Sequence, residues 1–74
     1  MIYQRIRDLR EDRDLSQAAL GAAVGVSQRT YAYYESGQRM LPPEILCALA
    51  RFHNVSTDYL LELTDEKKPY PKKR

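Results

Sequence analysis

The chain has 74 residues, of which 43% are hydrophobic and 30% are charged, which is enough for one small domain. Its single cysteine, Cys47, excludes an internal disulfide, and we expect it to be a small buried packing residue in a reducing compartment. No apolar run approaches the roughly 18 residues of a membrane span and no signal peptide is recognisable, so we expect a cytoplasmic protein that contacts no membrane.

The charges are divided unevenly along the chain, whose formal net charge is +2. Residues 1–66 hold 7 Lys and Arg against 10 Asp and Glu, so this part has a net charge of −3. Five cations follow, at Lys67, Lys68, Lys72, Lys73 and Arg74. The pI of the whole chain therefore says little about the surface of the domain.

The pattern of apolar residues predicts an all-α domain of five helices without a strand, because apolar positions recur at steps of three and four and nowhere alternate. In the first helix, Ile2, Ile6 and Leu9 form the inner stripe. Arg10 lies beside this stripe, where an unpaired buried cation would cost several kcal/mol. The side chain of Arg10 therefore needs an acceptor from elsewhere in the chain.

The second and third helices are expected to meet at a tight corner within the stretch AAVGVSQRTY, residues 22–31. Ser16 caps the second helix and Gly25 ends it in a left-handed conformation, while Ser27 caps the third helix and Gly37 ends it. Helical spacing divides the third helix into two faces. One face carries Tyr31, Tyr34 and Glu35, and the other carries Gln28, Arg29, Ala32, Tyr33 and Ser36.

The fourth helix is predicted to begin at Pro43 and to end at Asn54, and Ser56 is predicted to cap a short fifth helix. The inner positions of these two helices are Ile45, Leu49, Phe52, Leu60 and Leu61. The final stretch DEKKPYPKKR has two prolines and no apolar stripe. We therefore predict a folded domain over residues 1–65 and a basic, flexible C-terminal tail over residues 66–74.

The central residues resemble the helix-turn-helix pattern of the phage repressor and Cro type of regulators, also called the xenobiotic-response-element family. The matching positions are Gln17, Leu20, Gly21, Val24, Gly25 and Val26, followed by Tyr31 and Tyr34. Downstream, YESG and PPEILCALARFHNVSTDYLLELTD look like the end of the family's third helix and its fourth and fifth helices. The resemblance covers roughly residues 3–65. It implies a compact five-helix, lambda-repressor-like DNA-binding domain with the helix-turn-helix in helices 2 and 3.

Two structural expectations follow from the resemblance. The family places a small residue where helices 2 and 3 cross, and Gly21 satisfies this requirement at an expected cost of about 0.5–1 kcal/mol in helix stability relative to Ala. The family also pairs the Arg of the first helix with the Glu that ends the third, which implies an ion pair between Arg10 and Glu35. The alternative is that these two residues are unconnected surface charges.

The outward face of the third helix is the expected DNA-reading surface, because a helix in the major groove reads base edges with its N-terminal side chains. Gln28 can address adenine, Arg29 can address guanine through two hydrogen bonds, Ala32 can contact a thymine methyl, and Tyr33 can reach a phosphate or pack on sugar. The expected phosphate contacts are Gln17, Ser36 and Arg39. The alternative is a polar face that only meets water.

The resemblance also implies a homodimer, at least on DNA. The loop QRML lacks the several basic residues that some phage members carry there, and it exposes two apolar residues instead. The positions that the family uses across its two-fold axis correspond to Met40, Leu41, Thr57, Tyr59 and Leu60. The alternative is that Met40 and Leu41 are incidental apolar surface.

An enzyme is not expected, because the chain has one histidine and no arrangement of nucleophile and base. His53 is interpreted as a helix-capping residue, and no metal, cofactor or small-molecule ligand is predicted. The sequence thus predicts a sequence-specific transcriptional regulator, a repressor that binds an inverted-repeat operator in double-stranded DNA in the cytoplasm, at the bacterial or phage nucleoid. The competing hypothesis is a protein-interaction module of the same fold, such as an antitoxin or anti-regulator.

Overall fold

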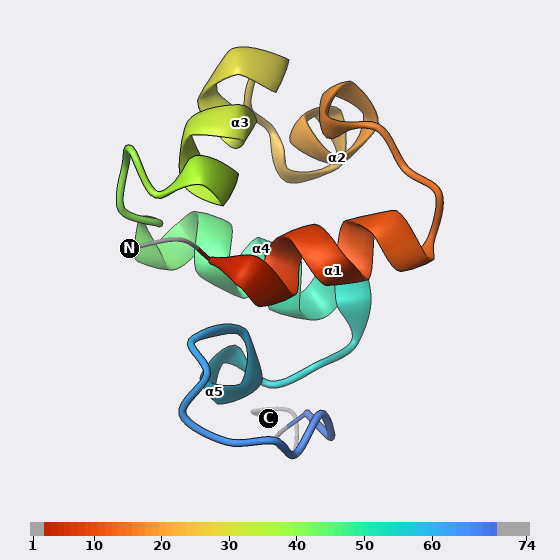
Figure 1. The fold of residues 1–74 in the computed structure, drawn as a ribbon, viewed down its shortest axis with the longest axis vertical. Helices are drawn as coiled ribbons and strands as arrows, with labels where there is room; N and C mark the ends of the chain where they lie inside the picture. Colours follow the sequence, from red (N-terminus) through yellow and green to blue (C-terminus); the bar gives the residue numbers. More distant parts are fainter. Residues whose placement is uncertain (1–2, 70–74) are drawn as a thin grey trace.

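The computed structural model describes residues 3–69, and within them it contains five helices and no strand. The helices are α1 Gln4–Asp12, α2 Gln17–Val24, α3 Gln28–Ser36, α4 Pro43–His53 and α5 Thr57–Leu60. Figure 1 shows α2 and α3 side by side at one end of the molecule and α5 at the other, with α1 and α4 between them. The all-α, five-helix prediction is therefore confirmed; Ile2 and residues 70–74 lie outside the described part of the chain.

Local signals define most of the helix ends. The hydroxyls of three serines accept a hydrogen bond from the backbone N–H three residues later, and each such cap is worth about 1 kcal/mol. These serines are Ser16, Ser27 and Ser56. Gly25, Gly37 and Asn54 end α2, α3 and α4 in the left-handed conformation, with φ of 85°, 81° and 55°. All six residues stand where the sequence predicted them.

The hydrophobic core draws on all five helices and on the segments between them. Its buried apolar members are Tyr3, Ile6, Leu20, Tyr31, Tyr34, Leu49, Ala50, Val55 and Leu60. Other residues predicted to face inward, among them Leu9, Val24, Ile45 and Phe52, are partly buried around this core. Because Leu20 and Tyr31 are fully buried, the core fixes both helices of the helix-turn-helix on α1 and α4.

The crossing of α2 and α3 requires glycine or a very small residue at position 21. Gly21 is buried, and a Cβ there would lie 3.0 Å from the Val26 carbonyl oxygen and 3.1 Å from that of Ser27. Both atoms belong to the backbone, so an alanine would force the turn to move by a few tenths of an ångström. This offsets at least part of the helix propensity that alanine would add.

The C-terminal segment is attached to the domain further than we expected. Arg5 Nη1 donates to the carbonyl oxygens of Tyr59 and Thr64, and its Nη2 lies 2.7 Å from Asp65 Oδ1. The N–H of Ser56 donates to the carbonyl of Lys67 at 3.0 Å. The chain therefore contacts the domain as far as Lys67, two residues beyond the expected boundary at residue 65. The remainder of the expected tail includes residues 70–74, which the description does not cover.

Two expectations for α4 are wrong. Cys47 is exposed, because it lies two residues from both Ile45 and Leu49 and therefore on the opposite side of the helix from the inner stripe. His53 lies four residues after Leu49, on the inner side, and is buried instead of capping the helix. Neither of its ring nitrogens has a hydrogen-bond partner within residues 3–69. No helix in the same residues is long and apolar enough to cross a bilayer.

Candidate nucleic-acid interface

Helix α3 has one buried and one accessible face, divided as its spacing predicted. Tyr31, Tyr34 and Glu35 are buried against the rest of the domain. On the other side Gln28, Arg29 and Ser36 are exposed, and Ala32 and Tyr33 are half-buried. The side chains expected to read DNA therefore share one accessible surface at the end of the molecule formed by α2 and α3 (Figure 1).

Arg10 and Glu35 form a two-pronged ion pair that fastens α3 to α1. Arg10 Nε lies 2.6 Å from Glu35 Oε2, and Arg10 Nη2 donates to Glu35 Oε1 at 3.1 Å. Arg10 Nη1 donates to the carbonyl of Leu15 at 2.8 Å. The guanidinium therefore has a partner for all three of its nitrogens, and it holds the end of the loop that leads to α2 as well as the end of α3.

The environment of the pair shifts the pKa of both residues in favour of their charged forms. Burial alone raises the pKa of Glu35, but the hydrogen bonds that its carboxylate accepts, that from Arg10 first, outweigh burial and lower the pKa overall. The hydrogen bond to Glu35 likewise raises the pKa of Arg10, against the effect of its own burial. Burial, and after it the nearby Glu35 carboxylate, raises the pKa of Tyr31. The pair is thus charged and the tyrosine neutral at neutral pH.

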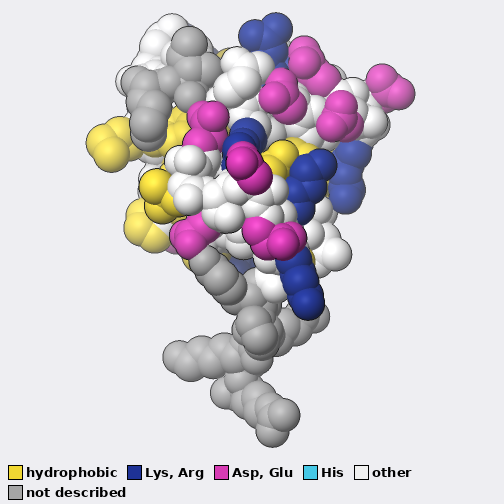
Figure 2. Space-filling view, turned by 60° about the horizontal axis from the view of Figure 1, so that its bottom comes forward, with side chains coloured by type: hydrophobic (Ala, Val, Ile, Leu, Met, Phe, Trp, Pro, Cys, Tyr) yellow, Lys and Arg dark blue, Asp and Glu magenta, His cyan; other side chains and the backbone are white. Residues whose placement is uncertain are grey.

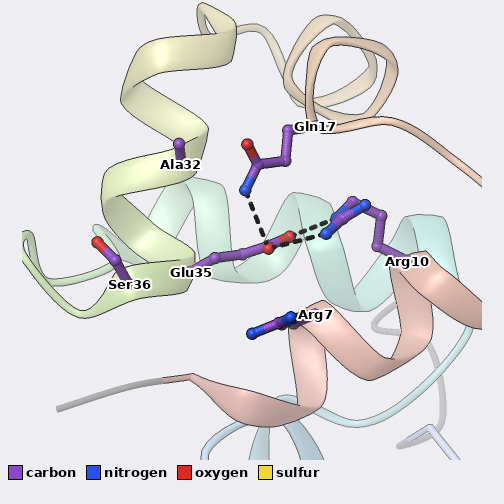
Figure 3. A pocket seen from close by; sticks show the side chains of 6 residues that line it. All are labelled: Arg7, Arg10, Gln17, Ala32, Glu35 and Ser36. Atoms are coloured by element: carbon purple, nitrogen blue, oxygen red, sulfur yellow. Dashed lines mark hydrogen bonds and ion pairs between the residues drawn. The ribbon is translucent and has the colours of Figure 1, made fainter.

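Gln17 completes this cluster from the first turn of α2. Its Nε2 donates to Glu35 Oε1 at 3.2 Å, as the dashed line in Figure 3 shows. Gln17 was expected to contact a phosphate, and in the free domain its amide contacts the buried carboxylate. Because Nε2 carries two hydrogens, one donor remains for a second partner.

A polar cavity of about 300 Å³ opens between α1, α2 and α3 beside this cluster. Its lining residues are Arg7, Arg10, Gln17, Ala32, Glu35 and Ser36 (Figure 3). Sequence reasoning paired Arg7 with Glu11, as the structure does at 3.4 Å with both side chains half-exposed, but did not assign Arg7 to this site. Since the charge of Arg10 is balanced by Glu35, Arg7 is the cation of the cavity most available to an anion. Its spacing of three residues from Arg10 could have indicated that both face the same side of α1.

The outer surface of α3 brings two cations to one tyrosine ring. Arg29 Nε donates to Tyr33 Oη at 2.9 Å, and Arg39, from the loop after α3, lies with its Cζ 4.9 Å from the centre of the same ring. Ser36 donates its hydroxyl proton to the Tyr33 carbonyl at 3.2 Å, so a contact from Ser36 to a phosphate requires the hydroxyl to rotate. Arg29 and Arg39 are both exposed.

Acidic residues are almost absent from the chain segment that carries α2 and α3. Residues 16–43 contain only three charged side chains, Arg29, Glu35 and Arg39, and Glu35 is already paired with Arg10. The other acidic residues precede Ser16 or follow Pro43 in the chain. Figure 2 shows one face of the molecule on which acidic side chains are mixed with Lys and Arg. The net negative charge of residues 1–66 therefore coexists with a positive surface on α3.

The residues expected at a dimer interface divide into accessible and inaccessible ones. Met40 is 82% exposed, and Leu41, Thr57 and Tyr59 are half-buried. Leu60 is 1% exposed, so the expectation that it contacts a second copy is wrong: its side chain belongs to the core. Leu63, at 72% exposed, was not anticipated, because it follows the end of the predicted inner stripe.

The arrangement of α2 and α3 defines the class of protein. Two short helices joined by a glycine turn, the second with a polar accessible face, form a helix-turn-helix. Among residues 3–69 no group of three or more His, Cys, Asp or Glu could hold a metal ion. The helix-turn-helix family model matches residues 6–60, and the chain belongs to this family. The family comprises DNA-binding transcription regulators and is not a class of enzymes.

Individual relatives agree with this assignment. The chain is 38% identical over 69 residues to the helix-turn-helix-type transcriptional regulator YobD of Bacillus subtilis, covering 93% of this chain and 62% of that protein. It is 40% identical over 55 residues to the cryptic phage CTXphi transcriptional repressor RstR of Vibrio cholerae, covering 74% of this chain and 50% of that protein. The chain thus spans only about half to three-fifths of these curated relatives.

A solved structure shares the fold. The P22 c2 repressor, crystallised in complex with a synthetic operator, superposes with a TM-score of 0.75 and 36% sequence identity, over 81% of this chain and 92% of that one. The expected lambda-repressor-like architecture is therefore confirmed.

Proposed function

We propose that this domain is a sequence-specific DNA-binding transcriptional repressor that lays α3 in the major groove of its operator. The observation that carries the proposal is the surface of α3, where Gln28 and Arg29 stand exposed at the N-terminal end of a helix that presents no exposed acidic side chain of its own. Membership of the helix-turn-helix family and likeness to two repressors support it, since one of these was crystallised with operator DNA.

Each side chain on this surface has a role that fits its chemistry. Gln28 offers the paired donor and acceptor that adenine accepts, Arg29 offers two donors to guanine, and Ala32 offers a methyl to thymine. Tyr33 is half-buried beside Arg29, and its ring is suited to packing on a sugar of the DNA backbone.

Phosphate contacts surround the reading surface. Arg39 is an exposed cation next to α3, and Gln17 lies at the N-terminus of α2, where free backbone amides and the helix dipole favour an anion. Ser36 lies at the other end of α3 and Arg7 lines the cavity between them. We assign these four residues to the DNA backbone, adding Arg7 to the three expected from the sequence.

A dimer on DNA follows from the size of the domain. One domain this small reads only a few base pairs, and two copies would place their α3 helices about 34 Å apart on one face of the duplex. We propose that the accessible apolar side chains of Met40 and Leu63, with Leu41, Thr57 and Tyr59, lie at or near the contact between the copies. The operator would then be an inverted repeat with half-site centres about 10 base pairs apart, bound in the cytoplasm at the nucleoid.

A second candidate is a protein-interaction module that docks a partner through α3. The net charge of −3 over residues 1–66 favours it, because an acidic domain is repelled by the DNA backbone. The two proposals differ in salt dependence and in sequence choice.

Selection of duplexes from a random pool, followed by binding measurements at two salt concentrations, tests the proposal. A DNA-binding repressor should enrich one inverted repeat, and its affinity should fall steeply as salt rises. No enrichment, together with no binding to random duplex at low salt, would exclude operator binding and leave the protein-interaction module.

A further inference from the structure

We infer that Tyr33 is a positioning residue, whose hydroxyl orients Arg29 so that the guanidinium presents its two terminal amino groups to guanine. The inference rests on the proposed function and deepens it, because it names the residue that sets the specificity of Arg29. The juxtaposition that carries it is the hydrogen bond from Arg29 Nε to Tyr33 Oη at 2.9 Å, between two residues one helical turn apart.

The contact decides which edge of the guanidinium is free. An arginine can donate a pair of parallel hydrogen bonds either from Nε and one terminal nitrogen or from both terminal nitrogens, Nη1 and Nη2. Because Nε of Arg29 is already donated to Tyr33 Oη, the first of these edges is occupied. The remaining edge, Nη1 with Nη2, has the donor geometry that matches O6 and N7 of guanine.

The same contact restricts a flexible side chain before DNA is bound. Arg29 is exposed, and an exposed arginine samples many rotamers that it must give up on binding. A hydrogen bond from Nε, together with the position of Arg29 Cζ 5.9 Å from the centre of the Tyr33 ring, limits this sampling in the free protein. The Arg29 side chain therefore loses less conformational entropy when it binds guanine than it would without Tyr33.

Tyr33 itself is held in place by the end of its helix. Its carbonyl accepts hydrogen bonds from the N–H groups of Gln38 and Arg39, at 3.0 and 3.3 Å, and from the hydroxyl of Ser36. The ring also lies beside the guanidinium of Arg39, whose Cζ is 4.9 Å from its centre. Tyr33 thus contacts both cations, Arg29 through its hydroxyl and Arg39 through the face of its ring.

The two cations depend on different parts of Tyr33. Arg29 uses the hydroxyl, whereas Arg39 uses only the ring face. Tyr33→Phe therefore removes the orientation of Arg29 and retains the contact with Arg39. This separation makes the inference testable independently of general DNA affinity.

The experiment compares the parent protein with Tyr33→Phe, Arg29→Ala and the matched control Tyr34→Phe, which removes a hydroxyl from the buried face of the same helix. The operator is the duplex that the parent protein selects from a random pool. Affinity is then measured for this duplex and for duplexes that replace the guanine whose selection is lost in Arg29→Ala. Tyr33→Phe should lower the preference for guanine about three- to tenfold, the equivalent of one net hydrogen bond. Its salt dependence and its affinity for random duplex should equal those of the parent, and Tyr34→Phe should keep the full preference.

A measurement on the free protein checks the contact itself. The Arg29 Nε–H resonance in the NMR spectrum should exchange with water more slowly than that of the exposed Arg51, and Tyr33→Phe should remove this protection. Unprotected Arg29 in the parent protein would show that the contact does not exist in solution.

The remaining outcomes separate this inference from the function on which it rests. An undiminished guanine preference in Tyr33→Phe, with the preference lost in Arg29→Ala, would overturn the positioning role and leave the base-reading role intact. Equal weakening on all sequences in Tyr33→Phe would make the hydroxyl a phosphate contact and would also overturn positioning. An Arg29→Ala protein with the parental base preference would overturn base reading by α3, and the inference about Tyr33 with it.

Discussion

Replacing Arg10 with alanine should destabilise the domain by about 3 kcal/mol, the lower part of the range for breaking a buried ion pair. We choose the lower part because Arg10 is 13% exposed, although Glu35 is only 5% exposed. The substitution removes both hydrogen bonds that Glu35 accepts from Arg10 and leaves the buried carboxylate with the amide of Gln17. Since each kcal/mol lowers the Tm of a domain this small by about 4–8 °C, the expected fall is about 12–24 °C.

Thermal unfolding followed by circular dichroism at pH 7 measures this effect. Glu35→Ala should be destabilised by a similar amount, because it leaves the guanidinium of Arg10 without its carboxylate. The double substitution should lose less than the sum of the two single ones, since it leaves no unpaired charge. Arg7→Ala is the control, because the pair of Arg7 with Glu11 is half-exposed and exposed pairs contribute at most about 1 kcal/mol. Equal Tm values for Arg10→Ala, Glu35→Ala and the parent would refute the reasoning.

The pair also gives the domain a dependence on acid. The pKa of Glu35 is lower in the folded protein than its ordinary value of 4.5, so the folded state binds the proton less readily than the unfolded chain. The stabilisation that the charged Glu35 carboxylate contributes is therefore complete above pH 4.5 and is lost as the pH falls below 4.5. In Arg10→Ala this loss should be absent, because the cation that lowers the pKa is gone.

The helices and their limits could be predicted from the sequence because their signals are local. Each serine cap acts over three residues, and each left-handed ending needs only glycine or asparagine at one position. The faces of α3 follow from spacing for the same reason. The pairing of Arg10 with Glu35, 25 residues apart, needed the resemblance to a family in addition to the requirement that a cation beside an apolar stripe find an acceptor.

The predictions failed where burial depends on contacts between distant parts of the chain or on the exact angle of a residue around its helix. Cys47 and His53 were interpreted by residue type, whereas their angles from Leu49 place the cysteine outside and the histidine inside. Leu60 was assigned to two roles, and burial selects the core. The contacts of Arg5 with residues 59–65 join positions more than fifty residues apart, which no local pattern predicts.

The candidate interface was predictable in its membership but not in its internal contacts. Spacing grouped Gln28, Arg29, Ala32 and Tyr33 on one face, and the structure keeps them there. That Arg29 donates to Tyr33, and that Arg39 returns from the following loop to the same ring, depends on how the chain leaves α3. The cation proposed to read a base and the cation proposed to bind phosphate therefore both contact Tyr33, a relation that the sequence pattern does not reveal.

Three further predictions concern DNA and acid. Arg29→Ala should cost about 1–3 kcal/mol on the selected operator and relax one base position in each half-site, as repeated selection would reveal. Deleting residues 70–74, which include three cations, should weaken binding to all duplexes alike and reduce the salt slope by up to about 0.9 per lost phosphate contact; an unchanged slope would mean that this end does not touch DNA. Burial, and after it the charge of Arg13, lowers the pKa of His53 from 6.5 to about 4. Between these two pH values His53 is protonated in the unfolded chain and neutral in the folded domain. The free energy of unfolding should therefore fall by about 3 kcal/mol as the pH drops from 6.5 to 4. His53→Leu should abolish the part of this slope above about pH 5 in urea titrations at successive pH values, because Glu35, whose pKa is also lowered by folding, is protonated in the unfolded chain only near 4.5. The same slope above about pH 5 in His53→Leu and the parent would assign the acid sensitivity to another residue.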